Sequence, residues 1–291
     1  EAAISAARWA AAVADRFETS LHIVHAIPDP GHLLSDAAAS VYAALITERR
    51  ALAETILKSA EETVRAKFPG VTVTATRFDE AASKVLTGLS RRARLIVLGC
   101  ADVSPGAALL LGSTTVAVTS HSACPVVAWR GGIVTPTDQP IVLGVDSEQT
   151  GQAAFQTAFE FADRLGVGVK AVHAWSTRRP PGDVTIPYLI DWEALETAEW
   201  TYLMNTVEPW SSRYPNVDVT YFVEAHGASR AILDQITDSQ LVVVGNRGRG
   251  VLASALLGST SLNLLHHSSV PVMVCRVRTP NAQSELLGEG N

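Results

Sequence analysis

The sequence predicts an α/β protein with two tandem domains, each a doubly wound, five-stranded parallel sheet with helices on both faces. The chain has 291 residues, short apolar runs alternate with helical stretches, and the second half repeats the first. ADR at Ala14 and VHA at Val24 recur 148 residues later, and LIVLG at Leu95 and LGST at Leu111 recur 146 residues later. A repeat this long indicates tandem domains and not a solenoid.

The second domain, which we place at residues 139–278, shows the complete pattern. Apolar runs predict five strands, at residues 141–146, 167–174, 217–223, 241–244 and 270–274. The periodic stretches between them predict helices at residues 150–165, 191–214, 228–237 and beyond Gly258. Pro215 marks the end of the second of these helices, because proline disfavours helix at the residue before it.

The first domain, which we place at residues 1–130, follows the same course except at its beginning. Glu1 aligns with Gln149, so the counterpart of strand 141–146 is expected to precede residue 1. A parallel sheet without its central strand would leave backbone groups unpaired. We therefore expect the natural protein to carry roughly ten to twenty further N-terminal residues that contain this strand.

Composition narrows the choice of partners and compartment. Hydrophobic residues make up 47% of the chain, which is enough for a substantial core, yet no run approaches the length of a membrane-spanning helix. The balance of 23 basic and 29 acidic residues leaves a formal charge of −6 without a basic block, which argues against nucleic acid or an anionic membrane as partner. The cysteines are odd in number and show no C-x-x-C spacing, which favours a reduced, cytoplasmic setting; they are Cys100, Cys124 and Cys275.

The most informative stretch is Leu241–Thr260. A buried strand ends at Gly245, Gly248 follows after two residues, and nine further residues lead to Gly258 and two hydroxyl side chains at a helix start. Glycines let backbone N–H groups face a ligand, and a helix N-terminus attracts anions. The spacing therefore predicts a phosphate-binding loop that differs from the dinucleotide and Walker patterns.

This G-x2-G-x9-G-(S/T) spacing resembles the nucleotide-binding signature of the universal stress protein family, in the tandem-domain branch that is typical of actinobacteria such as mycobacteria. The resemblance implies a Rossmann-like, HUP-type fold and ATP, with Mg²⁺, bound across the carboxyl ends of the strands. For the second domain it implies the following ligand contacts: Gly144, Asp146, Ala174, Val244, Gly245, Arg247, Gly248, Arg249, Gly250, Gly258, Ser259 and Thr260.

Several of these side chains have alternative interpretations. Asp146 suits hydrogen bonding to ribose hydroxyls, but it also suits the cap of the following helix. Arg247 and Arg249 suit phosphate oxygens, but arginines in an exposed turn are commonly only solvated. His25 and His173, in the two VHA strands, are expected to satisfy local polar groups and not to act as bases. We expect no catalytic residue and no protein-held metal cluster.

The first domain departs from the signature. Asp102 stands where the second glycine is required, and its negative charge disfavours a polyphosphate. Gly106 lies nearby and could re-form the glycine loop in a shifted register, so nucleotide binding by this domain stays an alternative. The first domain is therefore expected to be the weaker site, with these candidate residues: Ala26, Leu98, Gly99, Gly112, Ser113 and Thr114.

The resemblance implies a regulatory ATP-binding protein of the stress, hypoxia or growth-arrest response. One alternative is an enzyme, either a slow ATPase or a nucleotidyl-transfer relative, although no base for activating water is evident. A second alternative is an interaction module with a vestigial nucleotide pocket. The apolar last strands, residues 124–129 and 270–275, are expected to pair as sheet edges, giving a pseudo-dimer of the two domains and a homodimer of chains.

Overall fold

A computed structural model describes residues 2–28, 36–100, 112–146, 148–175, 191–246 and 257–276. The described residues fall into two compact units: those up to Pro136 form unit 1, and those from Thr137 onward form unit 2. Each unit is considered by itself. Within these ranges, no helix has the length and apolar character needed to cross a membrane.

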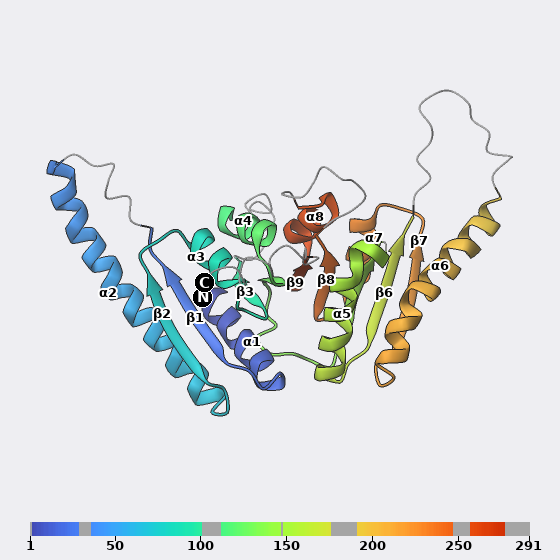
Figure 1. The fold of residues 1–291 in the computed structure, drawn as a ribbon, viewed down its shortest axis with the longest axis horizontal. Helices are drawn as coiled ribbons and strands as arrows, with labels where there is room; N and C mark the ends of the chain where they lie inside the picture. The colour runs from blue at the N-terminus through green and yellow to red at the C-terminus, as the bar shows by residue number, and fades with distance from the viewer. Residues whose placement is uncertain are drawn as a thin grey trace, which may run out of the picture. The chain divides into compact units, whose positions relative to one another are not determined.

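Unit 2 alternates strands and helices along the chain (Figure 1). Its elements are β5 (Ile141–Val145), α5 (Glu148–Leu165), β6 (Val169–Ala174), α6 (Trp192–Arg213), β7 (Val219–Glu224), α7 (Ala228–Asp234), β8 (Leu241–Gly245), α8 (Ser259–His267) and β9 (Val272–Cys275). These bounds agree with the predicted elements to within a few residues, and the largest difference is that α7 ends three residues early.

The strands of unit 2 form one parallel sheet in the order β9-β8-β5-β6-β7. Strand β5 lies at the centre, hydrogen-bonded to β6 on one side and to β8 on the other. Ile141, Val142 and Leu143 are 0% exposed, as expected for a strand that is covered on both faces. The predicted five-stranded parallel sheet is thus confirmed for this unit.

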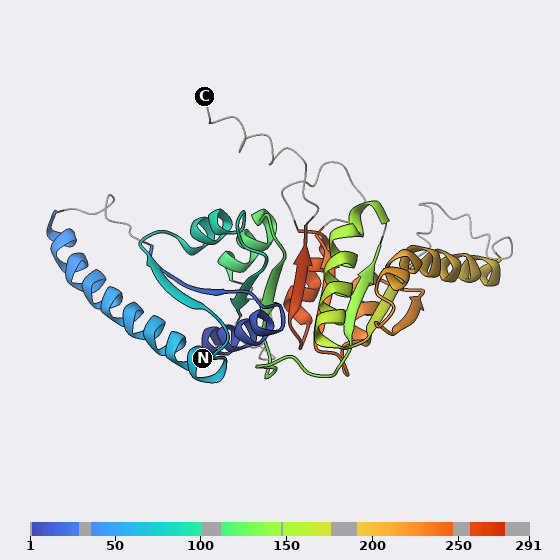
Figure 2. The ribbon, with the colours of Figure 1, turned by 60° about the horizontal axis from the view of Figure 1, so that its bottom comes forward.

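Helices cover both faces of this sheet, and the alternation of side chains along β6 shows it. The His173 ring reaches Glu199 on α6, whereas the Lys170 ammonium donates to the Gln235 carbonyl at the end of α7, 3.2 Å away. Helices α5 and α6 pack on the same face, and Figure 2 shows α5 lying over the strands. The rings of Phe155 on α5 and Trp210 on α6 stack 5.9 Å apart, so this tryptophan packs between the two helices.

Unit 1 repeats the alternation. Its elements are α1 (Ala2–Arg16), β1 (Leu21–Ala26), α2 (Asp36–Lys67), β2 (Val73–Phe78), α3 (Ala82–Leu89), β3 (Ile96–Gly99), α4 (Ser113–His121) and β4 (Val126–Trp129). Helix α2 lies along β1 and β2 in Figure 1 and contacts both strands.

The described residues of unit 1 do not include the first strand of the predicted five-stranded sheet, which is the strand expected to precede residue 1. Among its described residues there are four strands in two parallel pairs, β1 with β2 and β3 with β4. Helix α1 packs against both β3 and β1, but no described strand takes the place that β5 has between β6 and β8. Strand β1 is consequently half-exposed along most of its length, whereas its counterpart β6 is largely buried.

Candidate functional site

The candidate residues of unit 2 lie at one edge of its sheet. Strands β5, β6 and β8 are parallel neighbours, so their carboxyl ends meet at the same edge, and Gly144, Asp146, Ala174, Val244 and Gly245 all lie there. In open α/β sheets this edge is where ligands bind, because strand ends and helix N-termini converge on it. The structure therefore brings together the predicted residues that follow three separate strands.

Gly144 has a packing reason to be glycine. A Cβ at this position would lie 2.8 Å from Cδ1 of Ile232 on α7 and 3.0 Å from Cγ1 of Val244 on β8. Real side chains do not approach that closely, so a larger residue would require the Ile232 and Val244 side chains to shift. The close approach of α7 explains this glycine without a ligand.

The glycine-rich segment of unit 2 lies mostly outside the described residues, including Arg247, Gly248, Arg249 and Gly250. Its two ends are described, and they meet: the Gly258 N–H donates to the Asn246 carbonyl at 3.2 Å. The Ser261 hydroxyl donates to the Gly245 carbonyl at 2.9 Å. The first turn of α8 is therefore anchored directly beside the end of β8.

Helix α8 begins without a side-chain cap. Its N-cap residue is Gly258, which has no side chain to cap the helix, and no side-chain cap hydrogen bond is found there among the described residues. Helix α6, in contrast, is capped by Asp191, whose Oδ1 accepts from the Ala194 N–H at 2.9 Å. Free first-turn N–H groups and the positive end of the helix dipole favour an anion. Ser259, which is exposed, and Thr260, which is half-buried, add hydroxyl groups at the same turn.

A buried histidine ties α6 to the end of β5. His173 is 3% exposed, and its Nδ1 lies 3.1 Å from the Val145 carbonyl while its Nε2 lies 2.8 Å from Oε2 of Glu199. One helical turn further along α6, the Tyr202 hydroxyl donates to the Asp146 carbonyl at 2.8 Å. The rings of His173 and Tyr202 are in contact, with centroids 5.1 Å apart. The expectation that His173 satisfies local polar groups is confirmed.

Sequence reasoning did not find the roles of Glu199 and Tyr202, because these residues are 26 and 56 positions away from the residues they contact. The available signal was their spacing of three residues on α6, which places both side chains on one face of the helix. That signal does not identify which strand the face meets.

In unit 1 the corresponding edge is arranged differently. Gly112 is the N-cap of α4 and, as in α8, no side chain among the described residues caps the first turn. A Cβ at Gly99, however, would lie 2.8 Å from the Ala2 carbonyl oxygen, so the start of α1 lies directly against the end of β3. Ser113 is exposed, whereas these candidate residues are half-buried: Ala26, Leu98 and Thr114. Asp102 and Gly106 lie outside the described residues.

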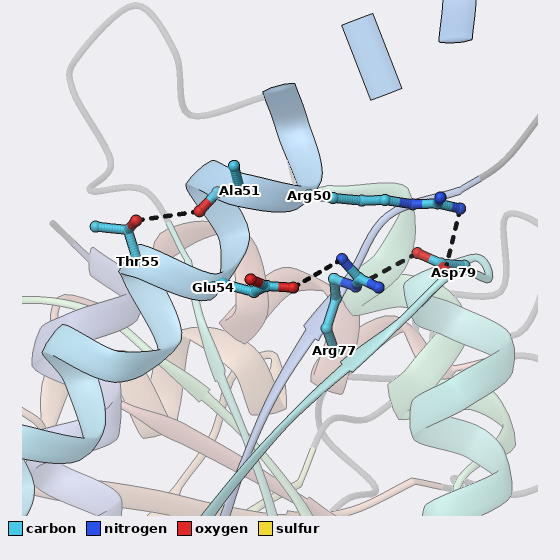
Figure 3. A network of polar contacts seen from close by, with 6 residues as sticks. All are labelled: Arg50, Ala51, Glu54, Thr55, Arg77 and Asp79. Carbon is cyan, nitrogen blue, oxygen red and sulfur yellow. Dashed lines mark hydrogen bonds and ion pairs between the residues drawn. The ribbon is translucent and has the colours of Figure 1, made fainter. Parts of the chain in front are cut away.

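In unit 1, ion pairs link α2 to β2 and to the residue that follows this strand (Figure 3). Arg77, at the end of β2, pairs with Glu54 on α2 at 3.2 Å and with Asp79 at 3.6 Å. Arg50 on α2 pairs with Asp79 at 3.2 Å. All four side chains are partly exposed, so these ion pairs contribute little to stability, about 1 kcal/mol or less each.

The described ranges contain no group of three or more His, Cys, Asp or Glu residues with the arrangement of a metal site. His266 and His267 are adjacent on α8 with ring centroids 6.2 Å apart, but they are not joined by a third ligand within these ranges.

Paired α/β units whose uncapped helices begin beside the carboxyl ends of strands are typical of proteins that bind phosphorylated ligands. The sequence profile of the universal stress protein family matches residues 1–130 and 139–276. The chain therefore belongs to the universal stress protein family, with two of its domains in tandem.

Individual relatives agree with this assignment. A universal stress protein of Mycobacterium tuberculosis is 33% identical over 281 residues, which cover 94% of this chain and 93% of the relative. One from Mycolicibacterium smegmatis is 30% identical over 279 residues, with the same coverage of 94% and 93%. The crystal structure of a universal stress protein from Archaeoglobus fulgidus shares the fold, with a TM-score of 0.70 at 19% identity over 96% of this chain and 95% of that one.

Proposed function

We propose that this protein is a regulatory ATP-binding protein and that unit 2 holds the nucleotide. The observation that carries the proposal is the start of α8, where two hydroxyl side chains and first-turn N–H groups that no described side chain caps lie beside the end of β8. The G-x2-G-x9-G-(S/T) spacing leads into this helix start. An anionic group such as a triphosphate satisfies both the free donors and the helix dipole.

The other candidate residues take roles that follow from their positions at the same edge. Gly258, Ser259 and Thr260 would hold phosphate oxygens, and the segment with Arg247 and Gly248 would complete the loop. Asp146 would accept hydrogen bonds from ribose hydroxyls, and the Ala174 backbone would face the base. Mg²⁺ would enter with the phosphates, since hydroxyl and carboxylate oxygens are the donors that it prefers.

Unit 1 is proposed to be the weaker site. Asp102 brings a negative charge to its loop, and the start of α1 already contacts Gly99. ATP bound to unit 2 would then act by mass action, since a ligand that binds the folded form stabilises it. We propose that this occupancy carries the signal in a stress, hypoxia or growth-arrest response.

A substitution at the start of α8 separates binding from folding. Gly258 has a φ of −61°, which any residue adopts, so Gly258→Asp places a carboxylate at the N-cap. The carboxylate caps the free N–H groups and repels phosphate, so we expect the melting temperature without nucleotide to stay equal or rise. Isothermal titration with Mg-ATP should show a loss of binding of at least about tenfold, corresponding to about 1.4 kcal/mol.

Gly112→Asp at the start of α4 is the matched control, because it makes the same change in unit 1 and should leave the main binding event intact. A wild-type protein that shows neither heat of binding nor a raised melting temperature with Mg-ATP, Mg-ADP or AMP contradicts the proposal and favours an interaction module. Release of phosphate by the wild type, lost in Gly258→Asp, favours the slow ATPase instead.

Two finer properties belong to the same proposal. Residence in the cytoplasm is supported by the cysteines, which all lie in the described ranges, are buried and form no disulfide: Cys100, Cys124 and Cys275. Pairing of the apolar strands β4 and β9, within a chain or between chains, stays a prediction from their edge character. Small-angle scattering tests the pairing, and separate, mobile domains would contradict it.

A further inference from the structure

The end of β5 in unit 2 is held from both faces of the sheet. On the α6 face, the carbonyls of the consecutive residues Val145 and Asp146 each accept a hydrogen bond, from His173 and from Tyr202. On the other face, Gly144 lies against Ile232 of α7 so closely that a Cβ would not fit. The backbone on either side of the Asp146 side chain is therefore fixed by neighbouring elements.

The His173 ring has a polar partner at each of its two nitrogens. Its Nδ1 donates to the Val145 carbonyl, which only accepts, at 3.1 Å. Its Nε2 lies 2.8 Å from Oε2 of Glu199, and the histidine side chain is 4% and the glutamate side chain 27% exposed. Removing one partner of such a pair leaves a polar group buried without its partner.

We propose that Tyr202 and the His173–Glu199 pair are positioning residues of the nucleotide site, which hold Asp146 where it meets the ribose. This inference rests on the proposed binding of ATP in unit 2. Hydrogen bonds that fix the groups around a binding residue reduce the ordering that the ligand must otherwise impose. Helix α6 thereby contributes to affinity without its side chains touching the ligand.

Unit 1 keeps the histidine but not its helix partners. The offset of 146 that aligns Phe68 with Tyr214 at the ends of α2 and α6 places Ala53 opposite Glu199 and Ile56 opposite Tyr202. Neither of these side chains can accept a hydrogen bond from an imidazole or donate one to a backbone carbonyl. The positioning contacts are thus specific to unit 2, in line with its assignment as the stronger site.

The first test removes a single hydroxyl. Tyr202→Phe keeps the ring, which is 37% exposed, and deletes only the hydrogen bond to the Asp146 carbonyl. We expect the Kd for Mg-ATP to rise about three- to tenfold, since one hydrogen bond contributes about that factor. Tyr214→Phe, at the opposite end of α6, is the matched control and should leave the Kd unchanged. Melting temperatures without nucleotide report whether either variant changes the fold.

The second test uses rescue by a conservative side chain. In Glu199→Leu, the His173 Nε2 loses its partner, and the Kd should rise by about tenfold or more. In Glu199→Gln, the amide N–H₂ donates to Nε2 of a neutral ring while Nδ1 still donates to Val145, so the Kd should return to within about threefold of the wild type. A role in folding alone would lower the melting temperature of both variants and leave the Kd of the folded protein unchanged.

The outcomes separate this inference from the proposed function. Wild-type protein that binds no nucleotide overturns both. Wild-type binding with an unchanged Kd in Tyr202→Phe and Glu199→Leu overturns the positioning role and leaves the proposed function in place. Weaker binding in these two variants, with rescue in Glu199→Gln and none of the effect in Tyr214→Phe, supports the positioning role.

Discussion

The two units share a chain plan, but different contacts link their long helices to the strand ends. In unit 2, α6 reaches the carboxyl end of β5 through the buried His173 and through Tyr202. In unit 1, α2 reaches the end of β2 through partly exposed ion pairs of Arg50 and Arg77. The histidine is common to both VHA strands, but the helix positions that hold Glu199 and Tyr202 in unit 2 hold Ala53 and Ile56 in unit 1.

The sheets differ in a related way. Strand β6 lies between β5 and β7 and is largely buried, whereas β1 pairs only with β2 among the described residues and is half-exposed along most of its length. A strand with two neighbours has its backbone groups paired on both sides and its side chains better covered. The comparison teaches that strands that share the VHA triplet differ in burial when they differ in their neighbours.

The largest expected effect is a loss of stability on truncating a buried valine, and it tests the difference in burial because the two strands carry a valine at matched positions. Val172 on β6 is 1% exposed, and Val24 is its half-buried counterpart on β1. Val172→Ala should destabilise unit 2 by about 2 kcal/mol, and Val24→Ala should cost unit 1 less than about 1 kcal/mol, because less apolar surface and a smaller cavity are involved. Hydrogen exchange followed by peptide assigns the loss to each unit. Equal losses would show that β1 is as well covered as β6.

A medium effect on stability is expected at the C-terminal ends of α1 and α5. Both helices end in the same backbone motif, but the residue with positive φ is a glutamate in unit 1 and a glycine in unit 2. Glu18 has a φ of 50° and Gly166 a φ of 68°, and both helices end in a Schellman motif, with Thr19 donating to Ala14 and Val167 donating to Ala162 at 2.9 Å. Glu18→Gly should stabilise unit 1 by roughly 0.5–1 kcal/mol, because glycine adopts positive φ without strain.

The reverse change, Gly166→Ala, should destabilise unit 2 by about 1 kcal/mol, although no atom outside its neighbours lies within 4 Å of the added Cβ. Urea unfolding of both variants measures the two shifts. Shifts of the same sign would mean that backbone conformation does not control these helix ends.

The smallest expected effect concerns pH. Lys170, whose side chain is 11% exposed, donates to Asp238, and this hydrogen bond holds the pKa of Asp238 below its ordinary value. A lowered carboxyl pKa adds stability above the unfolded pKa of about 4, and this stability is lost as the pH falls through the folded pKa. The wild type should therefore melt slightly above Asp238→Asn at neutral pH, and the gap should close below about pH 4.

Asp218→Asn, which changes another exposed aspartate of unit 2, serves as the control for the pH experiment. In unit 1 the counterparts of the pair are His22 and Arg92, and His22 contacts Thr76 instead, at 2.9 Å. A gap between the wild type and Asp238→Asn that persists unchanged into acid would contradict the assigned cause.

Much of the fold was predictable because it depends on local patterns. The repeat at offsets of 146 and 148 and the run LVVVG before Gly248 predict strand positions, since buried parallel strands need continuous apolar residues. The start of α8 at Ser259 was predictable from the helical spacing of the apolar residues that follow Gly258. In unit 1 the four described strands form two separate pairs, and the strand that the repeat predicts between them is the one expected to precede residue 1.

The candidate site likewise has features that follow from local sequence patterns and features that depend on tertiary packing. By itself the sequence determined which residues follow each strand, and parallel strands necessarily bring Asp146, Ala174 and Gly245 to one edge. Only the tertiary structure decided that Gly144 packs against α7 and that Glu199 and Tyr202 reach the end of β5. The reason is physical: strand ends are placed by short-period patterns, whereas contacts between a helix face and a distant strand depend on how the helix packs, which no local pattern contains.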